Sequence, residues 1–367
     1  MSQLRLEYEV LVSGIYPFQG QLEKGGFKSV WKTLDAKFLD EATEKGTIYI
    51  SPFIGMCCYP DAKGTPVYLI LQKDEVIDID YPSGKEYDRA ITNEHIEKLN
   101  VFDAVDTLEK TLVLEVNNDI KFPVKFVRAY DTQGNLVAFC ANFMKLNIPG
   151  LISNDKERVL EIIKRQNNRL GFGVLYEGIT ELADNNKYFK NALSMYHTSF
   201  SLSDHQAGFM LLMIALEALL ALNTYSKPET CESCGQVKYA ITATISQNVG
   251  LFLMDQDDSI KKRIKKLYSV RSKYVHEGKQ IPRQDQQEMQ EYVRKVLLMY
   301  WCISMKKSTS EHKEIIAEVQ SSEYKDDIMY KNFLTALGNV SFEEMRDRIL
   351  KDTLHAVRDA SKEGESV

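Results

Sequence analysis

The chain has 367 residues, which is enough for two or three domains. Its composition, 44% hydrophobic and 27% charged, is that of a globular protein with a sizeable core and excludes a largely disordered chain. The formal net charge of -6 excludes a uniformly basic surface, so any site for RNA or DNA must be a local basic patch.

No targeting or membrane segment is expected. The N-terminal stretch MSQLRLEYEVLVSG lacks a basic region followed by an apolar run, so it does not predict a signal peptide. The longest apolar run, GFMLLMIALEALLAL (208–222), contains Glu217 and is short for a membrane span, so it predicts a buried helix and no membrane contact. Six cysteines without a signal peptide suggest reduced thiols and a cytoplasmic location.

The first part of the chain, residues 1–148, predicts a β-rich α+β domain. Two helical segments are expected, at 31–46 and 93–110, and the turn DTQGN (131–135) predicts a hairpin over 121–144. No phosphate loop, GxGxxG or HExxH motif occurs here, so this domain carries no motif that indicates its function. Alternating or β-branched runs predict strands at LRLEYEVLVSGIY (4–16), GTIYISPF (46–53), TPVYLILQ (65–72), TLVLEVNN (111–118), FPVKFVRAYD (122–131) and NLVAFCANFM (135–144).

Helical periodicity dominates after about residue 150 and predicts an all-α bundle. We expect a helical connector at 149–185, a helical domain at 186–306 and a helical extension at 307–367. The first helix begins after the capping residue Asn154, and the last begins at Ser341, which forms a capping box with Glu344. Helices are predicted at 154–170, 186–202, 204–223, 236–254, 257–275, 285–306, 311–321, 326–336 and from 341 onward.

One segment of this bundle, SVRSKYVHEGK (269–279), combines an arginine and a histidine at a helix end. Arg271 and His276 are separated by four residues, and Gly278 is a suitable helix stop. We expect the helix to open near its end and to direct both side chains into one cleft. The pattern alone is weak, because a basic run is often a solvated face and a histidine before Glu-Gly is often a capping residue.

The charge around this motif favours a polyanionic ligand such as RNA. Between residues 261 and 283 a single acid, Glu277, stands among nine basic residues. These are Lys261, Lys262, Arg263, Lys265, Lys266, Arg271, Lys273, Lys279 and Arg283.

Two segments together resemble the HEPN superfamily of helical ribonucleases, in particular its ApeA-like branch. They are LLMIALEALLALN (211–223) and LYSVRSKYVHEGK (267–279), and the resemblance extends over about 186–306. Many catalytic members carry Asn, Asp or His after the arginine, whereas this chain has Ser272, a form associated with the ApeA-like branch. The matching positions are Glu217, Ala218, Leu219, Leu220, Leu267, Tyr268, Arg271, Ser272, Val275, His276 and Gly278.

The resemblance implies a metal-independent endoribonuclease that cleaves host RNA, with tRNA a plausible target, in bacterial antiphage defence by abortive infection. It implies a homodimer, or a higher oligomer built from dimers, that joins two motifs across a two-fold axis. The N-terminal domain would then sense a phage-derived trigger or regulate the nuclease. The residue types suit this chemistry, because histidine can serve as general acid or base and arginine can stabilise a phosphate transition state.

Neighbouring residues have supporting roles that the sequence leaves open. Ser272 either hydrogen-bonds phosphate or orients Arg271, and Tyr274 either stacks on a base or packs in the core. Glu217 lies in an apolar run, where it either pairs with Arg271 or a neighbouring base, or faces solvent at the edge of the bundle. The lysines expected to hold backbone phosphates are Lys262, Lys265, Lys266, Lys273 and Lys279.

A second motif, CESCG (231–235), raises the question of a structural zinc ion. Cys231 and Cys234 supply two thiolates, and a tetrahedral site needs two more ligands. His205 or His197 would approach the two cysteines if the loop folds back, or two copies of the chain would share the ion. The alternative is a pair of free thiols in an exposed loop.

Two functions from different classes therefore remain open. The first is the endoribonuclease with Arg271 and His276 as catalytic residues, which needs no cofactor for cleavage. The second is a non-catalytic HEPN scaffold that binds RNA or a partner protein. A weaker third is a zinc-dependent regulator centred on Cys231 and Cys234.

Overall fold

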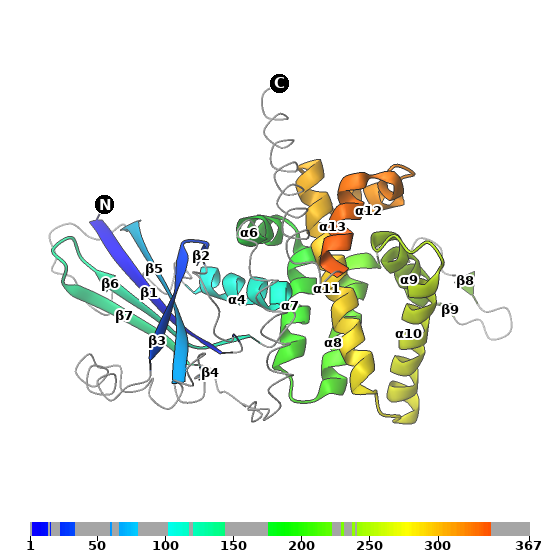
Figure 1. The fold of residues 1–367 in the computed structure, drawn as a ribbon, viewed down its shortest axis with the longest axis horizontal. Coiled ribbons are helices and arrows are strands. Elements are labelled where there is room, and N and C mark those ends of the chain that lie inside the picture. Colours follow the sequence, from blue (N-terminus) through cyan, green and yellow to red (C-terminus); the bar gives the residue numbers. More distant parts are fainter. Residues whose placement is uncertain are drawn as a thin grey trace, which may run out of the picture. The chain divides into compact units, whose positions relative to one another are not determined.

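A computed structural model describes residues 2–13, 15, 23–33, 59–60, 66–79, 102–116, 120–143, 175–221, 229–230, 237–238 and 241–338 (Figure 1). The chain divides into two compact units, Met1–Tyr176 and Glu177–Val367. The first unit is built on an antiparallel β-sheet, and the second is helical. The predicted α+β character, with strands before helices, is therefore confirmed.

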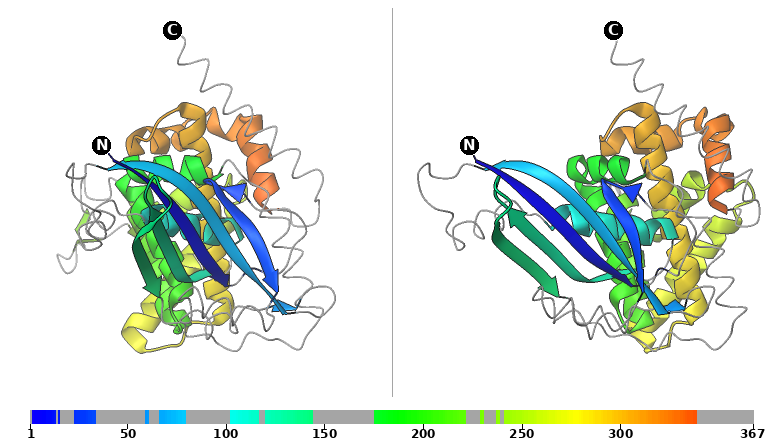
Figure 2. Two further views of the ribbon diagram at one scale, coloured as in Figure 1. Left: turned by 90° about the vertical axis from the view of Figure 1, so that its left-hand side faces the viewer. Right: turned by 60° about the vertical axis from the view of Figure 1, so that its left-hand side comes forward.

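The strands described in the first unit form one antiparallel sheet in the order β2-β3-β5-β1-β6-β7, with β4 paired to β5. Figure 2 shows these strands side by side. Their bounds are β1 (Ser2–Ser13), β2 (Glu23–Lys24), β3 (Phe27–Thr33), β4 (Tyr59–Pro60), β5 (Pro66–Ile79), β6 (Lys121–Tyr130) and β7 (Leu136–Phe143).

The sequence patterns of β1, β6 and β7 explain their conformation. Along β1 every second residue is buried, from Leu4 through Leu6 and Tyr8 to Val10, which is the period of a strand with one covered face. The predicted hairpin is confirmed, because the Gly134 N–H donates to the Asp131 carbonyl oxygen over 3.0 Å between β6 and β7.

The predicted strand TLVLEVNN is wrong, because residues 103–116 form helix α4 (Asp103–Val116). Val105, Leu108 and Leu112 are fully buried at helical spacing, so the helix that begins at Asp103 continues through a stretch of high β propensity. Two buried ion pairs join α4 to the sheet. Lys24 Nζ lies 2.8 Å from Glu115 Oε2, and Lys125 Nζ lies 3.1 Å from Glu109 Oε2.

The predicted helix at 31–46 is wrong at its start, since Trp31, Lys32 and Thr33 belong to β3 and pair with β5. The rest of that prediction lies outside the described residues. So do the predicted strand at 46–53, the helix at 154–170 and the helix beginning at Ser341.

Seven of the predicted helices of the second unit are confirmed, with small shifts at their ends. They are α7 (Lys187–Ser201), α8 (His205–Leu220), α9 (Ile241–Phe252), α10 (Ser259–Glu277), α11 (Arg283–Lys307), α12 (His312–Gln320) and α13 (Ile328–Gly338). The unit further contains α6 (Leu175–Asn185), the short strands β8 (Glu229–Thr230) and β9 (Val237–Lys238), and the 3-10 turn η2 (Tyr324–Asp326).

The helical unit is centred on α11, which contacts α7, α8, α9, α12 and α13. Tyr300 and Trp301 of α11 are fully buried there. Helix α8 is buried along much of its length, as the apolar run 208–222 predicted. Among the described helices, none is long and apolar enough to cross a membrane.

The domain limits drawn from the sequence stay a prediction in part. The two units meet at 176/177, whereas the sequence put the end of the β-rich part near 148. Most of the proposed connector (149–185) and much of the extension (307–367) lie outside the described residues.

Candidate functional site

Helix α10 carries the Arg/His motif, and hydrogen bonds at both ends fix where the helix begins and where it stops. At its start, Asp257 Oδ1 accepts a hydrogen bond from the Ser259 N–H over 3.1 Å, and Asp255 Oδ2 accepts one from the Lys261 N–H over 2.9 Å. At its end, Gly278 adopts a left-handed conformation with φ of 66° and its N–H donates to the Tyr274 carbonyl oxygen over 3.1 Å. The predicted stop at Gly278 is therefore confirmed.

The helix does not open before this stop, contrary to the expectation from sequence. Residues 271–277 keep helical geometry, so His276 lies in the last regular turn. Five residues of α-helix turn the side chain by about 140°, and Arg271 and His276 therefore leave α10 in different directions. A cleft that uses both groups thus needs a second element, or a second copy of the chain, to bring them to one substrate.

The side chain of Arg271 is anchored on α8. Its Nη1 lies 3.1 Å from Glu217 Oε1, so of the alternatives that the sequence left open for Glu217, the structure has the pairing with Arg271. Tyr268, one turn earlier on α10, donates its hydroxyl to the same Glu217 oxygen over 3.3 Å. The Arg271 guanidinium carbon lies 6.0 Å from the centre of the Tyr268 ring, within the range of a cation–π contact.

Arg271 still has unused hydrogen-bonding capacity. Its Nε is buried and makes no hydrogen bond within the described part of the chain, although the side chain as a whole is 32% exposed. A guanidinium carries five N–H donors, and Glu217 takes up one side of it. Arg271 therefore keeps donors that the described residues do not use.

The remaining residues of the motif face solvent. Ser272, Lys273 and His276 are exposed, and Tyr274 is half-buried. Val275 is 56% exposed. The end of α10 thus presents an imidazole, a hydroxyl and an ammonium group to the surface together.

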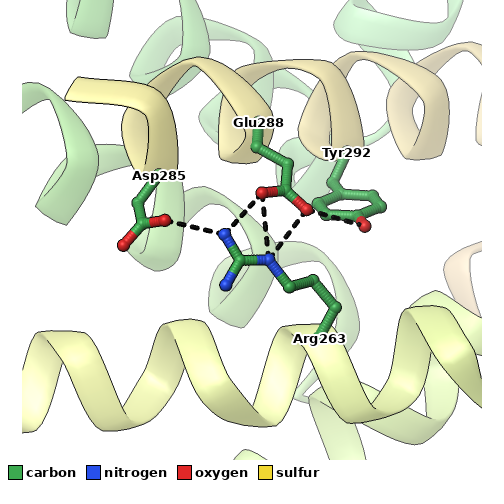
Figure 3. Close-up of polar contacts among 4 residues, drawn as sticks. All are labelled: Arg263, Asp285, Glu288 and Tyr292. Atoms are coloured by element: carbon green, nitrogen blue, oxygen red, sulfur yellow. Dashed lines mark hydrogen bonds and ion pairs between the residues drawn. The ribbon is translucent and has the colours of Figure 1, made fainter. Parts of the chain in front are cut away.

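The basic run is less positive than the sequence indicated, because α11 supplies acids to it (Figure 3). Arg263 Nε lies 2.9 Å from both carboxylate oxygens of Glu288, and its Nη2 lies 2.7 Å from Asp285 Oδ1. The Tyr292 hydroxyl donates to Glu288 Oε1 over 3.1 Å. Hydrogen bonds from Arg263 hold the pKa of Glu288 below its usual range.

Two arginines of one helix are thus in opposite states. Arg263 and Arg271 lie about 12 Å apart along α10, and each meets a glutamate that also accepts from a tyrosine. Arg263 is satisfied by two carboxylates, whereas Arg271 has one carboxylate and a buried Nε without a partner in the described part. Arg263 therefore links α10 to α11 through two carboxylates, whereas Arg271 keeps a donor without a partner in the described part of the chain.

The lysines assigned to RNA binding are exposed. Lys262, Lys265 and Lys266 form no ion pair with any described residue, whereas Lys279 lies 2.6 Å from Glu277. Residues 262, 266, 269, 273 and 276 follow one another at intervals of four and three, so they share one face of α10. His276 lies on this face with Lys262, Lys266 and Lys273.

The proposed zinc ligands cannot be placed. Cys231 and Cys234 lie outside the described residues, between β8 and β9. His205 Nε2 lies 2.8 Å from the Ile281 carbonyl oxygen. Within the described ranges no three His, Cys, Asp or Glu side chains gather as metal ligands do.

No family model, curated protein or solved structure matches this chain.

Sequence reasoning missed the role of Tyr268 and of the acids on α11. Tyr268 stands one turn before Arg271, a spacing that places the two side chains on one face of a helix. This spacing was the available indication. Asp285 and Glu288 belong to another helix, so only the packing of α10 against α11 brings them to Arg263.

Proposed function

We propose that the chain is a metal-independent endoribonuclease of the HEPN type that acts in bacterial antiphage defence. The observation that carries this proposal is the state of Arg271, which is held by Glu217 and keeps unused donors beside an exposed helix end. His276 and Lys273 are exposed at that same end. An anchored guanidinium, an imidazole and ammonium groups are the components that cleavage of RNA through its own 2′-hydroxyl requires.

The reaction is a transfer within the RNA backbone. The 2′-oxygen attacks the adjacent phosphorus, its proton passes to a base, and the bond from phosphorus to the 5′-oxygen breaks. The leaving 5′-oxygen takes a proton, so the products carry a 2′,3′-cyclic phosphate and a 5′-hydroxyl. His276 serves as the base or the acid, and Arg271 stabilises the charge on the non-bridging phosphate oxygens.

A homodimer supplies the second proton-transfer group. One histidine cannot take one proton and give another in the same step, and two copies related by a two-fold axis provide two. The different directions in which Arg271 and His276 leave α10 fit a site on the two-fold axis that takes both residues from each copy. In this proposal the N-terminal unit senses a phage-derived trigger, and cleavage of host RNA, with tRNA a plausible target, stops growth.

Single substitutions at the two catalytic positions test the proposal. We expect Arg271→Ala and His276→Ala to abolish phage protection and RNA cleavage in infected cells, with the fold and oligomeric state retained. Purified wild-type protein should cleave RNA in the presence of EDTA, and a 2′-deoxy nucleotide at the cleaved position should block the reaction. Lys325→Ala, an exposed change outside α10, is the matched control.

The proposal is wrong if pure wild-type protein cleaves no RNA with or without phage components. It is equally wrong if both folded variants keep cleaving, or if the 2′-deoxy RNA is cut. Circular dichroism and sedimentation of each variant separate a lost active site from a lost fold.

A non-catalytic HEPN scaffold that binds RNA or a partner protein is the second candidate. The ion pair between Arg271 and Glu217 favours it, because this pair joins α10 to α8 whether or not the arginine contacts RNA. In this case Arg271→Ala and His276→Ala leave the cellular phenotype intact, and no RNA fragments form in wild-type cells.

A further inference from the structure

The contact set around Arg271 includes a buried tyrosine that the proposed reaction does not yet use. Tyr268 is 5% exposed, so the residue as a whole is buried. Its partner is Glu217 Oε1, the oxygen that also pairs with Arg271 Nη1. The aromatic ring of Tyr268 meanwhile lies within cation–π range of the guanidinium. Tyr268 therefore meets Arg271 both directly and through the glutamate.

The hydroxyl of Tyr268 acts as a donor in this set. Burial raises the pKa of this phenol, and the neighbouring Glu217 carboxylate raises it further, so the group keeps its proton. A carboxylate that accepts two hydrogen bonds on one oxygen has less freedom to rotate than one that accepts a single bond. Glu217 in turn decides where Nη1 of Arg271 lies.

We infer that Tyr268 is a positioning residue for Arg271, acting through Glu217, in the proposed cleavage of RNA. Its hydroxyl fixes the carboxylate, the carboxylate fixes one side of the guanidinium, and the ring supports the guanidinium plane. The other side of Arg271 is thereby directed to the non-bridging oxygens of the phosphate. This inference rests on the proposed function, since it assigns a task to Arg271.

The chain contains its own matched control. Tyr292 donates to Glu288, and Glu288 binds Arg263, which lies on α10 as Arg271 does. Tyr292→Phe therefore removes an equivalent hydroxyl from a set with no proposed role in the reaction. Tyr268→Phe and Tyr292→Phe each keep the ring and delete one donor. A general effect of losing such a donor will appear in both variants, whereas an effect on Arg271 will appear in the first alone.

The reaction test uses the full-length protein and end-labelled bulk tRNA. We expect Tyr268→Phe to lower the single-turnover cleavage rate at saturating protein by about tenfold, with the apparent Kd for tRNA changed by less than about twofold. Tyr292→Phe should leave both values unchanged. Glu217→Gln should lower the rate as well, and the double variant Tyr268→Phe/Glu217→Gln should be no slower than the slower single variant, because the two act as one unit. Fully additive losses, or an unchanged rate in Tyr268→Phe, overturn the inference.

A second measurement does not depend on catalysis. The Nε–H of Arg271 is buried, so its ¹H–¹⁵N NMR signal should exchange slowly with water, and Arg271→Lys identifies this signal by its disappearance. Tyr268→Phe should speed this exchange at least about fivefold while the Arg263 signal is unchanged. If wild type cleaves no RNA but this shift occurs, the proposed function fails and the positioning of Arg271 stands. Unchanged exchange in both Tyr268→Phe and Glu217→Gln overturns the positioning itself. Where one of the two variants folds poorly, unchanged exchange in the other has the same result.

Discussion

At the scale of single residues, His312 is a buried histidine whose ring contacts a buried tyrosine hydroxyl. It begins α12, is 5% exposed, and its Nδ1 lies 2.6 Å from the Tyr300 hydroxyl. Asn186 donates to that hydroxyl over 2.8 Å, so the hydroxyl in turn donates to Nδ1 and the ring proton is on Nε2. Nε2 is buried and has no hydrogen-bond partner among the described residues. A second ring proton has no acceptor here, so the imidazole of His312 is neutral in the folded protein.

This neutral state makes the stability of the helical unit depend on pH. Burial lowers the pKa of His312 to about 4, whereas an unfolded histidine titrates near about 6.5. Between these values the unfolded chain binds a proton that the folded chain refuses, so stability is complete above about pH 6.5 and falls as the pH drops towards about 4. We expect the wild type to lose about 2 kcal/mol more than His312→Gln between pH 7.5 and pH 5.

Urea unfolding followed by Trp301 fluorescence measures this loss. A Trp31→Phe background removes the other of the two tryptophans, so the fluorescence reports the helical unit. Carboxylates titrate equally in both proteins, and their effect cancels in the comparison. Equal losses of stability in wild type and His312→Gln would show that the folded state tolerates the charged ring.

The sequence was informative at the residue scale where a residue contrasted with its neighbours. Glu217 stands alone in an apolar run, which indicated a partner, and Arg271 is that partner. Tyr268 has no such contrast, because a tyrosine between apolar residues of a helix is ordinary. Its role follows only from the direction in which α8 presents Glu217, and this direction is a property of packing rather than of local sequence.

At the scale of elements, periodicity predicted the long helices well and failed where two patterns overlap. The segment TLVLEVNN has strand-like composition, yet residues 111–116 continue a helix that begins at Asp103, and residues 111–115 of this helix are all buried. Opening of α10 near Arg271 was expected from function alone. The capping geometry of Gly278 instead keeps the helix regular to its end.

The link between α10 and α11 is the element-scale contact that we expect to matter most for stability. Arg263→Met leaves Glu288 and Asp285 without their cation while it keeps most of the side-chain volume. We expect a loss of about 1–3 kcal/mol in the free energy of unfolding at pH 7, measured by urea. The exposed change Arg283→Met, at the start of α11, is the control and should cost less than about 0.5 kcal/mol.

The pH dependence of that loss gives an independent check. Arg263 lowers the pKa of Glu288, so this carboxylate contributes stability above its unfolded pKa of about 4.3 and loses the contribution as the pH falls through its folded pKa. The difference between wild type and Arg263→Met should therefore shrink below about pH 4. A constant difference would mean that lost packing, not the ion pair, accounts for the effect.

At the scale of the whole molecule, the net charge has the same sign as the proposed RNA substrate, whereas one helix presents positive charge. The chain carries a net charge of -6, which repels RNA, while Lys262, Lys265 and Lys266 stand exposed on α10. On such a protein, the affinity for RNA should depend on the position of the basic side chains and not on the net charge of the chain. This property could be anticipated from the run of basic residues, although the neutralisation of Arg263 by α11 could not.

Charge reversal at two different places separates the effect of where the lysines lie from the effect of the net charge. Reversing Lys262, Lys265 and Lys266 to Glu, and reversing Lys190, Lys313 and Lys325 to Glu, change the net charge equally, and all six side chains are exposed. In a His276→Ala background, which by the proposed mechanism does not cleave RNA, we expect the first triple variant to bind tRNA at least about tenfold more weakly than the second at 0.1 M salt. The negative slope of log affinity against log salt should become shallower by about 2 for the first variant alone, because each of the three lost phosphate contacts contributes about 0.7. Equal weakening in both variants would mean that RNA responds to total charge, and α10 would then not be its binding face.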